Sequence, residues 1–473
     1  MSETEARLFD RYRDEFVAEA DRSQNPTVFF QDGTEGLFSD REKFLYRWIS
    51  PDNHTRFFME FLGSADARVQ EAEGQLSRVV LGQVGGRFRG TAGGTVGFGL
   101  QATNGMVFGD TAFARSDAAL RKNSNFGEWG NQYFDFSEAY VGVGWSWGDA
   151  SLGRERVLIG GAHGDRVALG MGAPVFDALR LNARVGKFRF MYIHGFILAE
   201  KQLIEVFRPY YENKYFVYHR AEADLFESVR FGVYESVIYS QRQIDPGYLL
   251  PVNFFKSAEH AGGDRDNPML GFDLQSLSLP GLELFGSWTI DDIDMAKFGS
   301  GWWGNKFIWQ AGAVTHSLGD TRIGLEYTRI EPYVYSHAMR DNEYTHKGVA
   351  LGLELPPNSD EWYAHATWWY GASLSFGASL RLRRHGANEY EDDGSLRTNH
   401  GGSVTERFVF GRDNEMAPFL GGARETRKIL TLNCRYEPVR NMVLDAAVRF
   451  TKAEDRTGSH NTGYGSLLLE IAY

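Results

Sequence analysis

The sequence lacks the features of a disulfide-stabilised, metal-binding or helical membrane protein. Cys434 is the only cysteine among 473 residues, which excludes an internal disulfide or a cysteine metal cluster, and we interpret it as a small apolar side chain in a strand. The longest charge-free run, residues 90–109, is interrupted by Gly, Thr, Gln and Asn and does not predict a spanning helix. Residues Met1–Glu5 are acidic and precede no signal-peptide core, so we expect that an export signal has been removed from this chain.

Positive charge and proline are also scarce. The chain has 50 Lys and Arg against 62 Asp and Glu, a formal net charge of -12, which argues against nucleic acid as a partner. Only 13 residues are proline, whereas 54 are glycine and 14% are aromatic, which favours strands and tight turns over helices. The mean hydropathy of -0.37 is compatible with a membrane barrel, because only alternate strand residues face lipid.

Residues 264–361 repeat an alternation of apolar and polar side chains, with aromatic clusters next to Gly- and Asp-rich turns. Leu282, Leu284, Trp288 and Ile290 share one face of a predicted strand, and Phe285 is an exception on the polar face. A membrane-spanning β-barrel needs such aromatic clusters at its two lipid–water interfaces.

The last third of the chain has the most regular alternation. Residues 374–383 and 441–450 each place apolar side chains on one face of a strand. A soluble sandwich would alternate in the same way. The chain ends, however, on Leu467, Leu469, Ile471 and Tyr473 along one face, and a final strand that closes on an aromatic residue resembles the terminal strand of bacterial outer-membrane barrels.

The fold class that we predict is all-β, a transmembrane antiparallel β-barrel of about 18 strands with a short N-terminal helix, at roughly 22–25 residues per strand and connection. Residues 1–50 form an N-terminal amphipathic helix (1–24) and a linker, in the periplasm or docked on the barrel rim, and residues 51–473 form the barrel. A short solvent-facing cap is the alternative for the helix. The wide lumen is either an open pore or filled by inward Arg, Glu, Asp and His side chains.

Two segments interrupt the strand pattern. Residues 246–260 predict a short helix or folded loop, and residues 384–424 predict a large extracellular loop or a lumen plug, with a disordered loop as the alternative. The expected strands in the first half of the chain are 55–62, 76–90, 93–102, 133–147, 152–160, 187–198, 214–224 and 227–240.

Several motifs between residues 150 and 361 resemble the capsule-assembly Wzi family of outer-membrane barrels. The resemblance implies location in the outer membrane of a Gram-negative bacterium and lectin-like retention of surface polysaccharide. The chain departs from the family pattern near 154–172, where Leu158–Gly164 replaces a Trp-Gly-Pro-Gly-like stretch. The matching segments are 188–195, 214–220, 235–239, 259–260, 263–267, 271–273, 290–293, 302–306, 326–337, 344–346 and 357–361, with a weaker match at 43–46.

Aromatic and charged residues of these motifs are the candidate binding site. Trp302 and Trp303, beside Lys306, suit stacking on a sugar ring, although an interfacial aromatic belt is the alternative. The remaining candidates for polysaccharide binding are Asp264, Arg265, Asp266, Asp291, Asp292, Tyr333 and Tyr335. Their carboxylates could instead bind Ca²⁺ or form salt bridges, but they match no complete calcium loop, and we expect no metal and no cofactor.

No HExxH spacing or other catalytic motif is present, so we expect no enzyme activity. We expect the recurring histidines to be buried and hydrogen-bonded in the lumen; they are His194, His219, His260, His337 and His346.

The function that we predict is non-catalytic binding or organisation of capsular or extracellular polysaccharide at the cell surface. The expected partners are surface polysaccharide and outer-membrane lipid, with other surface-assembly proteins as further candidates. Two alternatives stay open: a porin-like channel or exporter, and a membrane platform for a larger surface assembly.

Overall fold

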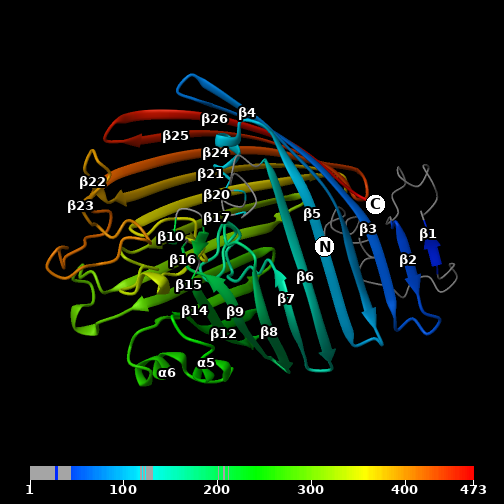
Figure 1. Ribbon diagram of the computed structural model, residues 1–473, viewed down its shortest axis with the longest axis horizontal. Helices are drawn as coiled ribbons and strands as arrows, with labels where there is room; N and C mark the ends of the chain where they lie inside the picture. Colours follow the sequence, from blue (N-terminus) through cyan, green and yellow to red (C-terminus); the bar gives the residue numbers. More distant parts are fainter. Residues whose placement is uncertain are drawn as a thin grey trace.

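The computed structural model describes residues 27–29, 44–117, 120, 123, 132–200, 202–205, 208–210 and 212–473. Within these residues the predicted fold class is confirmed, because the chain forms one closed antiparallel barrel with a few short helices (Figure 1). None of the helices in the described part is long and apolar enough to cross a membrane. The predicted N-terminal helix, 1–24, lies outside the described residues.

The barrel closes between its first and last strands. The main sheet has 20 strands; β1 (Thr27–Phe29) and β2 (Tyr46–Ile49) lie outside the ring, which leaves 18. The closing pair joins β3 to β26, with Leu62 opposite Ala472. In order around the ring, the strands are β3 (Arg56–Ala72), β4 (Gln75–Ala92), β5 (Val96–Gly109), β6 (Tyr133–Trp145), β7 (Gly148–Glu155), β8 (Phe176–Val185), β9 (Phe188–Leu198), β12 (Asn213–Phe226), β13 (Val229–Ser240), β14 (Asn267–Leu279), β15 (Leu282–Asp292), β16 (Lys306–Leu318), β17 (Thr321–Ile330), β20 (Ser359–Tyr370), β21 (Leu374–Ala387), β24 (Ala423–Val439), β25 (Met442–Asp455) and β26 (Gly458–Ala472).

The two ends of the barrel differ in their connections. At the end where β26 finishes, the hairpins turn within two or three residues, as at 186–187 and 319–320. The opposite end carries the long connections, which include α3 (Thr111–Ala114), α5 (Pro246–Leu249) and α6 (Phe255–Ala261). Outer-membrane barrels have short periplasmic turns and longer extracellular loops. We therefore name the first end the inner end and the second the outer end.

Apolar side chains form a belt around the outside of the wall. Leu382 of β21, Phe450 of β25 and Leu467 of β26 are 40%, 57% and 52% exposed, as the predicted alternation requires. Such a continuous exposed apolar surface marks a contact with lipid. Exposed aromatic residues lie near both ends of the belt, with Trp309 and Trp362 toward the outer end and Trp145, Trp147, Trp368 and Tyr370 toward the inner end.

Some predicted boundaries were wrong. The strand expected over 152–160 ends at Glu155, because the chain then turns into the barrel interior, and β8 was not predicted at all. The helix or folded loop expected at 246–260 is confirmed as α5 and α6. The long loop expected at 384–424 is confirmed over 388–422, where it contains β22 (Glu389–Tyr390) and β23 (Leu396–Thr398).

Candidate functional site

Two connections from the outer end fold into the barrel and pack against each other; we call them the plug. They are residues 156–175, between β7 and β8, and residues 331–358, between β17 and β20. The Tyr335 hydroxyl donates to the Val167 carbonyl at 2.9 Å, and the Tyr344 hydroxyl donates to the Ala168 carbonyl at 2.8 Å. The Gly170 amide donates to the Leu351 carbonyl at 2.8 Å. The plug is therefore held by hydrogen bonds between segments that are far apart in sequence.

Apolar packing fixes the plug to one side of the inner wall. Leu169, Val334 and Leu351 are fully buried and share one cluster with Phe216 of β12 and Ile308 of β16. Burying several such side chains stabilises the plug, at about 1.5–3 kcal/mol for each one. The plug thus occupies the part of the lumen beside β8–β17.

Among the described residues, two cavities lie in the rest of the lumen, and the larger has the more polar lining. The larger, about 1050 Å³, extends from Leu198, Asn213 and Lys347 at the outer end to Asn441 and Ala472 at the inner end. The smaller, about 730 Å³, lies beside plug residues 158–163 and reaches the inner turn at 146–147. The larger cavity therefore follows the wall that the plug leaves free.

Ion pairs line much of the remaining interior, which agrees with the filled one of the two lumen states left open by the sequence. Arg220 forms two hydrogen bonds with Asp273, at 2.5 and 2.6 Å. Glu361 accepts from Arg381 at 2.5 Å and also pairs with Arg383. These bidentate and shared contacts compensate the cost of burying charge inside the barrel.

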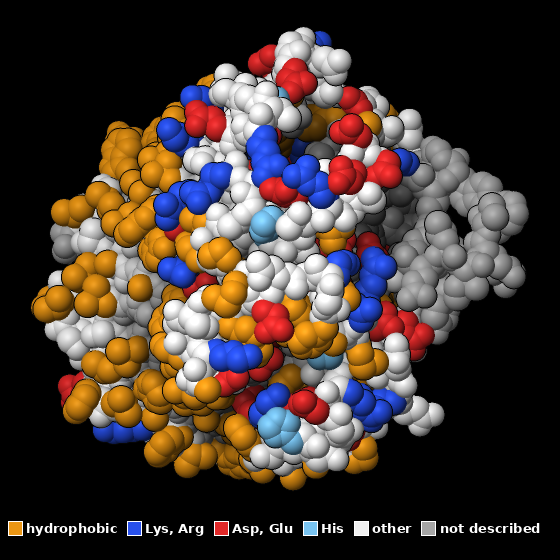
Figure 2. Space-filling view, turned by 90° about the vertical axis from the view of Figure 1, so that its left-hand side faces the viewer, with side chains coloured by type: hydrophobic (Ala, Val, Ile, Leu, Met, Phe, Trp, Pro, Cys, Tyr) orange, Lys and Arg blue, Asp and Glu red, His pale blue; other side chains and the backbone are white. Residues whose placement is uncertain are grey.

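The outer connections join one another and the plug; we call the assembly of residues 241–266, 293–305 and 388–422, together with the stretch 331–350 that it shares with the plug, the cap. Asn342 donates to the Arg265 carbonyl at 2.9 Å and accepts from Ser240 at 2.6 Å. Asn358, at the base of the cap, donates to the Gly386 and Gly421 carbonyls at 2.8 and 3.0 Å. Figure 2 looks onto this end and shows acidic and basic side chains interspersed across it.

Trp302 and Trp303 join two segments of the cap. The backbone around Trp302 pairs with Met416, and the ring of Trp303 stacks on Phe408 with centroids 3.8 Å apart and 4° between the planes. The ammonium group of Lys297 lies 3.9 Å from the centroid of the Trp302 ring. Trp303 is therefore part of the cap's packing, and Trp302 has the cation of Lys297 over its ring.

Four other predicted residues gather beneath Trp303. Lys306 lies 3.7 Å from an Asp291 oxygen, whose other oxygen accepts from the Tyr335 amide at 2.7 Å. Tyr333 is fully buried and meets Trp303 edge-on. The structure thus brings Trp303, Lys306, Asp291, Tyr333 and Tyr335 together, with the two tyrosines in the scaffold.

The predicted acidic residues divide into two environments. Asp266 is buried, where it binds Arg242 at 2.5 and 2.8 Å, whereas Asp264, Arg265 and Asp292 are exposed on the cap. These three exposed side chains are the ones that a soluble polymer can reach directly.

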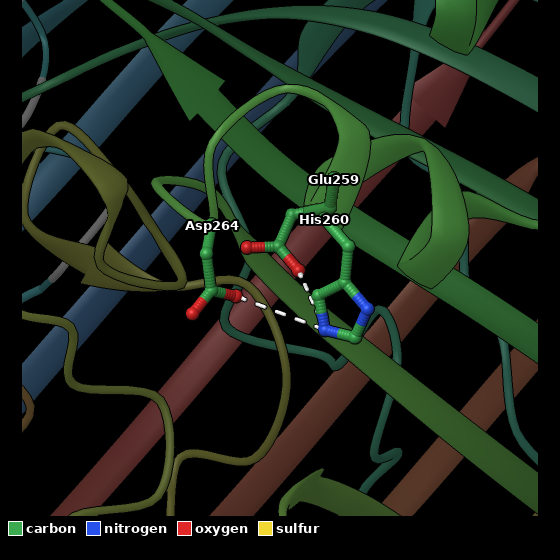
Figure 3. A group of neighbouring side chains, drawn as sticks. All are labelled: Glu259, His260 and Asp264. Atoms are coloured by element: carbon green, nitrogen blue, oxygen red, sulfur yellow. Dashed lines mark ion pairs between the residues drawn. The ribbon is translucent and has the colours of Figure 1, made fainter.

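One group of three possible metal ligands occurs in the described part of the chain, at the end of α6. His260 Nε2 lies 3.8 Å from an oxygen of Glu259 and 3.8 Å from one of Asp264 (Figure 3). The ammonium group of Lys256 already lies 2.9 Å from Glu259 and 3.8 Å from Asp264. Since a protein cation already neutralises these carboxylates, the geometry is that of an ion-pair network.

The prediction of lumen histidines was wrong for His194, His219 and His260. His194 and His219 point to the outside of the wall, because the neighbouring Ile193 and Tyr218 pack against the plug. His219 contacts Glu235 at 3.0 Å and the Pro251 carbonyl at 2.8 Å. The side chain of His260 is 61% exposed on α6.

The segment 246–261 covers this polar patch on the outer wall. Its Phe255 and Lys256 amides donate to Glu235 at 2.9 and 3.3 Å, and Phe255 stacks on His219 with centroids 4.1 Å apart. Polar groups on a lipid-facing wall are costly unless they are paired and covered. The sequence signal was present, since His194, His219 and Glu235 lie at positions that alternate with inward residues.

Two further histidines lie as expected inside the cap and plug. His346 is buried and accepts a hydrogen bond from the Leu198 amide at 2.9 Å, and burial lowers its pKa to about 3. Burial, followed by the nearby charge of Lys306, lowers the pKa of His337 to about 4. Both rings are therefore neutral at neutral pH.

No protein-family model matches the chain, and no curated protein is significantly similar to it in sequence. Solved structures share its fold. Wzi, an outer-membrane protein involved in group 1 capsule assembly in Escherichia coli and a carbohydrate-binding β-barrel, superimposes with a TM-score of 0.55 at 13% identity, over 87% of this chain and 84% of Wzi.

Two barrels from Pseudomonas aeruginosa are similar to the same degree. OccK8 (OprE) has a TM-score of 0.52 at 8% identity, and OpdL has 0.51 at 11% identity; each match covers 88% of this chain and 98% of the other. At these identities the likeness concerns the fold. The chain is thus an 18-strand barrel of the bacterial outer-membrane type.

Proposed function

We propose that this protein binds surface polysaccharide non-catalytically at the outer end of the barrel. The observation that carries the proposal is the cap, in which four connections are joined by hydrogen bonds and ring stacking into one ordered polar surface. A preorganised surface loses little entropy when it binds, and a repetitive polymer can engage several weak sites at once. The fold likeness to a carbohydrate-binding barrel agrees with this role.

Substitution of the exposed residues Arg265 and Asp292 tests the proposal directly. The detergent-purified protein is mixed with surface polysaccharide from its own host, and the affinity is compared with that of Arg265→Gln/Asp292→Asn. Because hydrogen bonds to charged groups contribute about 1.5–3 kcal/mol, we expect the affinity to fall at least about tenfold. Glu227→Gln, an exposed change in the inner turn between β12 and β13, is the matched control and should bind like the wild type.

The tryptophan pair needs a second readout. Trp302→Ala/Trp303→Ala should also lose binding, but the loss of the Trp303–Phe408 stack loosens the cap, so cap order must be followed by hydrogen exchange. Binding that survives both double changes would move the site elsewhere. A wild-type protein that binds no polysaccharide would overturn the proposal.

A substrate channel is the second candidate, and the larger cavity favours it. Its lining includes residues at both ends of the barrel, which is the geometry that passage of a small solute requires. In planar bilayers, stable open steps would support this role. Gln101→Trp, which adds bulk to the cavity lining, should then reduce conductance, whereas Leu432→Trp on the outer wall should not.

A further inference from the structure

A groove of about 490 Å³ lies on the outside of the wall, near the outer end of β16 and β17. Trp309 and Tyr327 form its floor, and the segments 298–305 and 417–419 of the cap overhang it. The outward direction follows from β16, where the neighbouring residues Ile308 and Gln310 contact the plug. This groove therefore faces the membrane and not the lumen.

The position of the groove matches the boundary between lipid tails and headgroups. Trp309 is 39% exposed and belongs to the outer aromatic group, and Phe298 above it is 54% exposed. Toward the membrane centre, Leu325 and Ile323 of β17 continue the apolar wall with exposures of 51% and 43%. An occupant with a ring-shaped polar head and apolar tails would fit both parts, whereas a soluble polymer would use only the upper one.

Two cations lie at the groove: Arg329 lines it together with Glu331, and Lys297 lies at its edge, over the lining residue Trp302. Lys297 lies over Trp302, and among the described residues it has no carboxylate within ion-pair distance. The guanidinium of Arg329 lies 3.8 Å from the centroid of Phe419 and forms an ion pair with Glu331 at 2.6 Å, and its side chain is 37% exposed. A phosphate at this position would share the guanidinium with the Glu331 carboxylate. Two cations beside aromatic rings suit a phosphorylated sugar, because rings contact its C–H face and cations bind its phosphate.

We propose that this groove binds the phosphorylated sugar headgroup of an outer-leaflet glycolipid. Lys297 and Arg329 bind the phosphate, Trp302 and Trp309 contact the sugar, and the acyl chains lie on Leu325. This site faces the membrane and shares Trp302 with the cap, whereas Arg265 and Asp292 of the polysaccharide surface do not line it. Bound glycolipid would hold the overhanging segment 298–305 against the wall.

The test uses the full chain in lipid nanodiscs that contain a bisphosphorylated disaccharide glycolipid. Native mass spectrometry counts the glycolipid that stays on the protein after transfer to detergent. We expect Lys297→Gln/Arg329→Gln to retain at least about fivefold less, with retention by Lys452→Gln, a lysine on β25, unchanged. The chemically dephosphorylated glycolipid should be retained poorly by the wild type. Equal retention of the two lipids, or by the double variant, would overturn the proposal.

Two further experiments distinguish a membrane glycolipid from a soluble phosphorylated sugar and control for misfolding. The deacylated, water-soluble phosphorylated disaccharide should compete only weakly, because it lacks the contacts with Leu325; competition as strong as that of the intact lipid would overturn the assignment to a membrane lipid. Lys297→Glu, an exposed loop change that reverses the charge, guards against misfolding, and retention by this variant equal to the wild type would also overturn it. Polysaccharide binding should be unaffected in Arg329→Gln, a change on β17 outside the cap, which separates a failure of this site from a failure of the proposed function.

Discussion

The side chain of Asn358 is the perturbation that tests the cap most directly. It is fully buried, and its amide group donates to the carbonyls of Gly386 and Gly421, while its oxygen accepts from the Leu420 amide at 2.6 Å. Its backbone has a φ of 57°, which Asn adopts more readily than Ala. Asn358→Ala therefore removes three short hydrogen bonds and introduces backbone strain.

The expected cost is worked out from these contacts. Each buried hydrogen bond lost costs about 1 kcal/mol or more, and the backbone conformation adds about 1 kcal/mol. The sum, about 4 kcal/mol, corresponds to roughly a thousandfold shift in the opening equilibrium of the cap. The barrel itself should stay folded, because its strand pairing is not involved.

Hydrogen exchange measures this opening residue by residue. In Asn358→Ala, the Leu420 and Gly386 amides should exchange up to about a thousandfold faster, whereas amides of β25 should be unchanged. Asn461→Ala, an exposed asparagine of β26, is the matched control. Polysaccharide affinity should fall in Asn358→Ala although Asn358 touches no ligand. Unchanged exchange at Leu420 in a correctly folded barrel would refute the reasoning.

Three further predictions concern the cap, the plug and the covered outer wall. The pKa of His337 is lowered from 6.5 to about 4, so the unfolded cap binds a proton first and cap stability is lost as the pH falls from about 6.5 toward 4. His337→Asn should weaken this dependence in limited proteolysis at pH 7.5 and 5, and the remaining dependence should come from His346, whose pKa is lowered to about 3. Gly352→Ala places a Cβ 2.2 Å from the Tyr335 hydroxyl, so the plug should shift and its amides exchange faster, unlike Gly463→Ala in open space. Glu235→Ala removes the acceptors of two α6 amides, so trypsin should cleave at Lys256 sooner than in the wild type, with barrel stability little changed.

The inward and outward faces of the strands could be predicted from the sequence, because the two sides of the barrel wall lie in different surroundings. Lipid selects apolar side chains on one side of each strand, and the polar interior leaves the other side mixed. The one exception noted, Phe285, is explained by the plug, because it packs inward against Ala162. An inward apolar residue at this position thus indicated that an apolar segment packs inside the lumen.

The plug could not be predicted, because its segments look like ordinary strand sequence. Ile159 and Leu169 read as apolar strand positions, yet they pair only with each other. Their packing partners, such as Leu351, come from a connection far along the chain, and no local pattern specifies such a contact. The candidate residues around Trp303 were identified by type, but their division into exposed and buried members depends on the cap.

The outer end is asymmetric, and this asymmetry separates the two candidate functions in space. The connections that build the cap and plug join strands between β7 and β24. The β3–β4 and β25–β26 hairpins at the same end are tight turns. The larger cavity runs beside β3–β6 and β24–β26 and, at its outer end, also beside β8, β9, β12 and residues 346–347; its lining includes no residue of 241–266, 293–305 or 388–422. A change in the cap, such as Asn358→Ala, should therefore alter polymer binding while leaving any conductance in place, and Gln101→Trp should do the reverse. A variant that impaired both activities without unfolding the barrel would mean that the cap controls entry to the larger cavity, and that binding and transport are steps of one process.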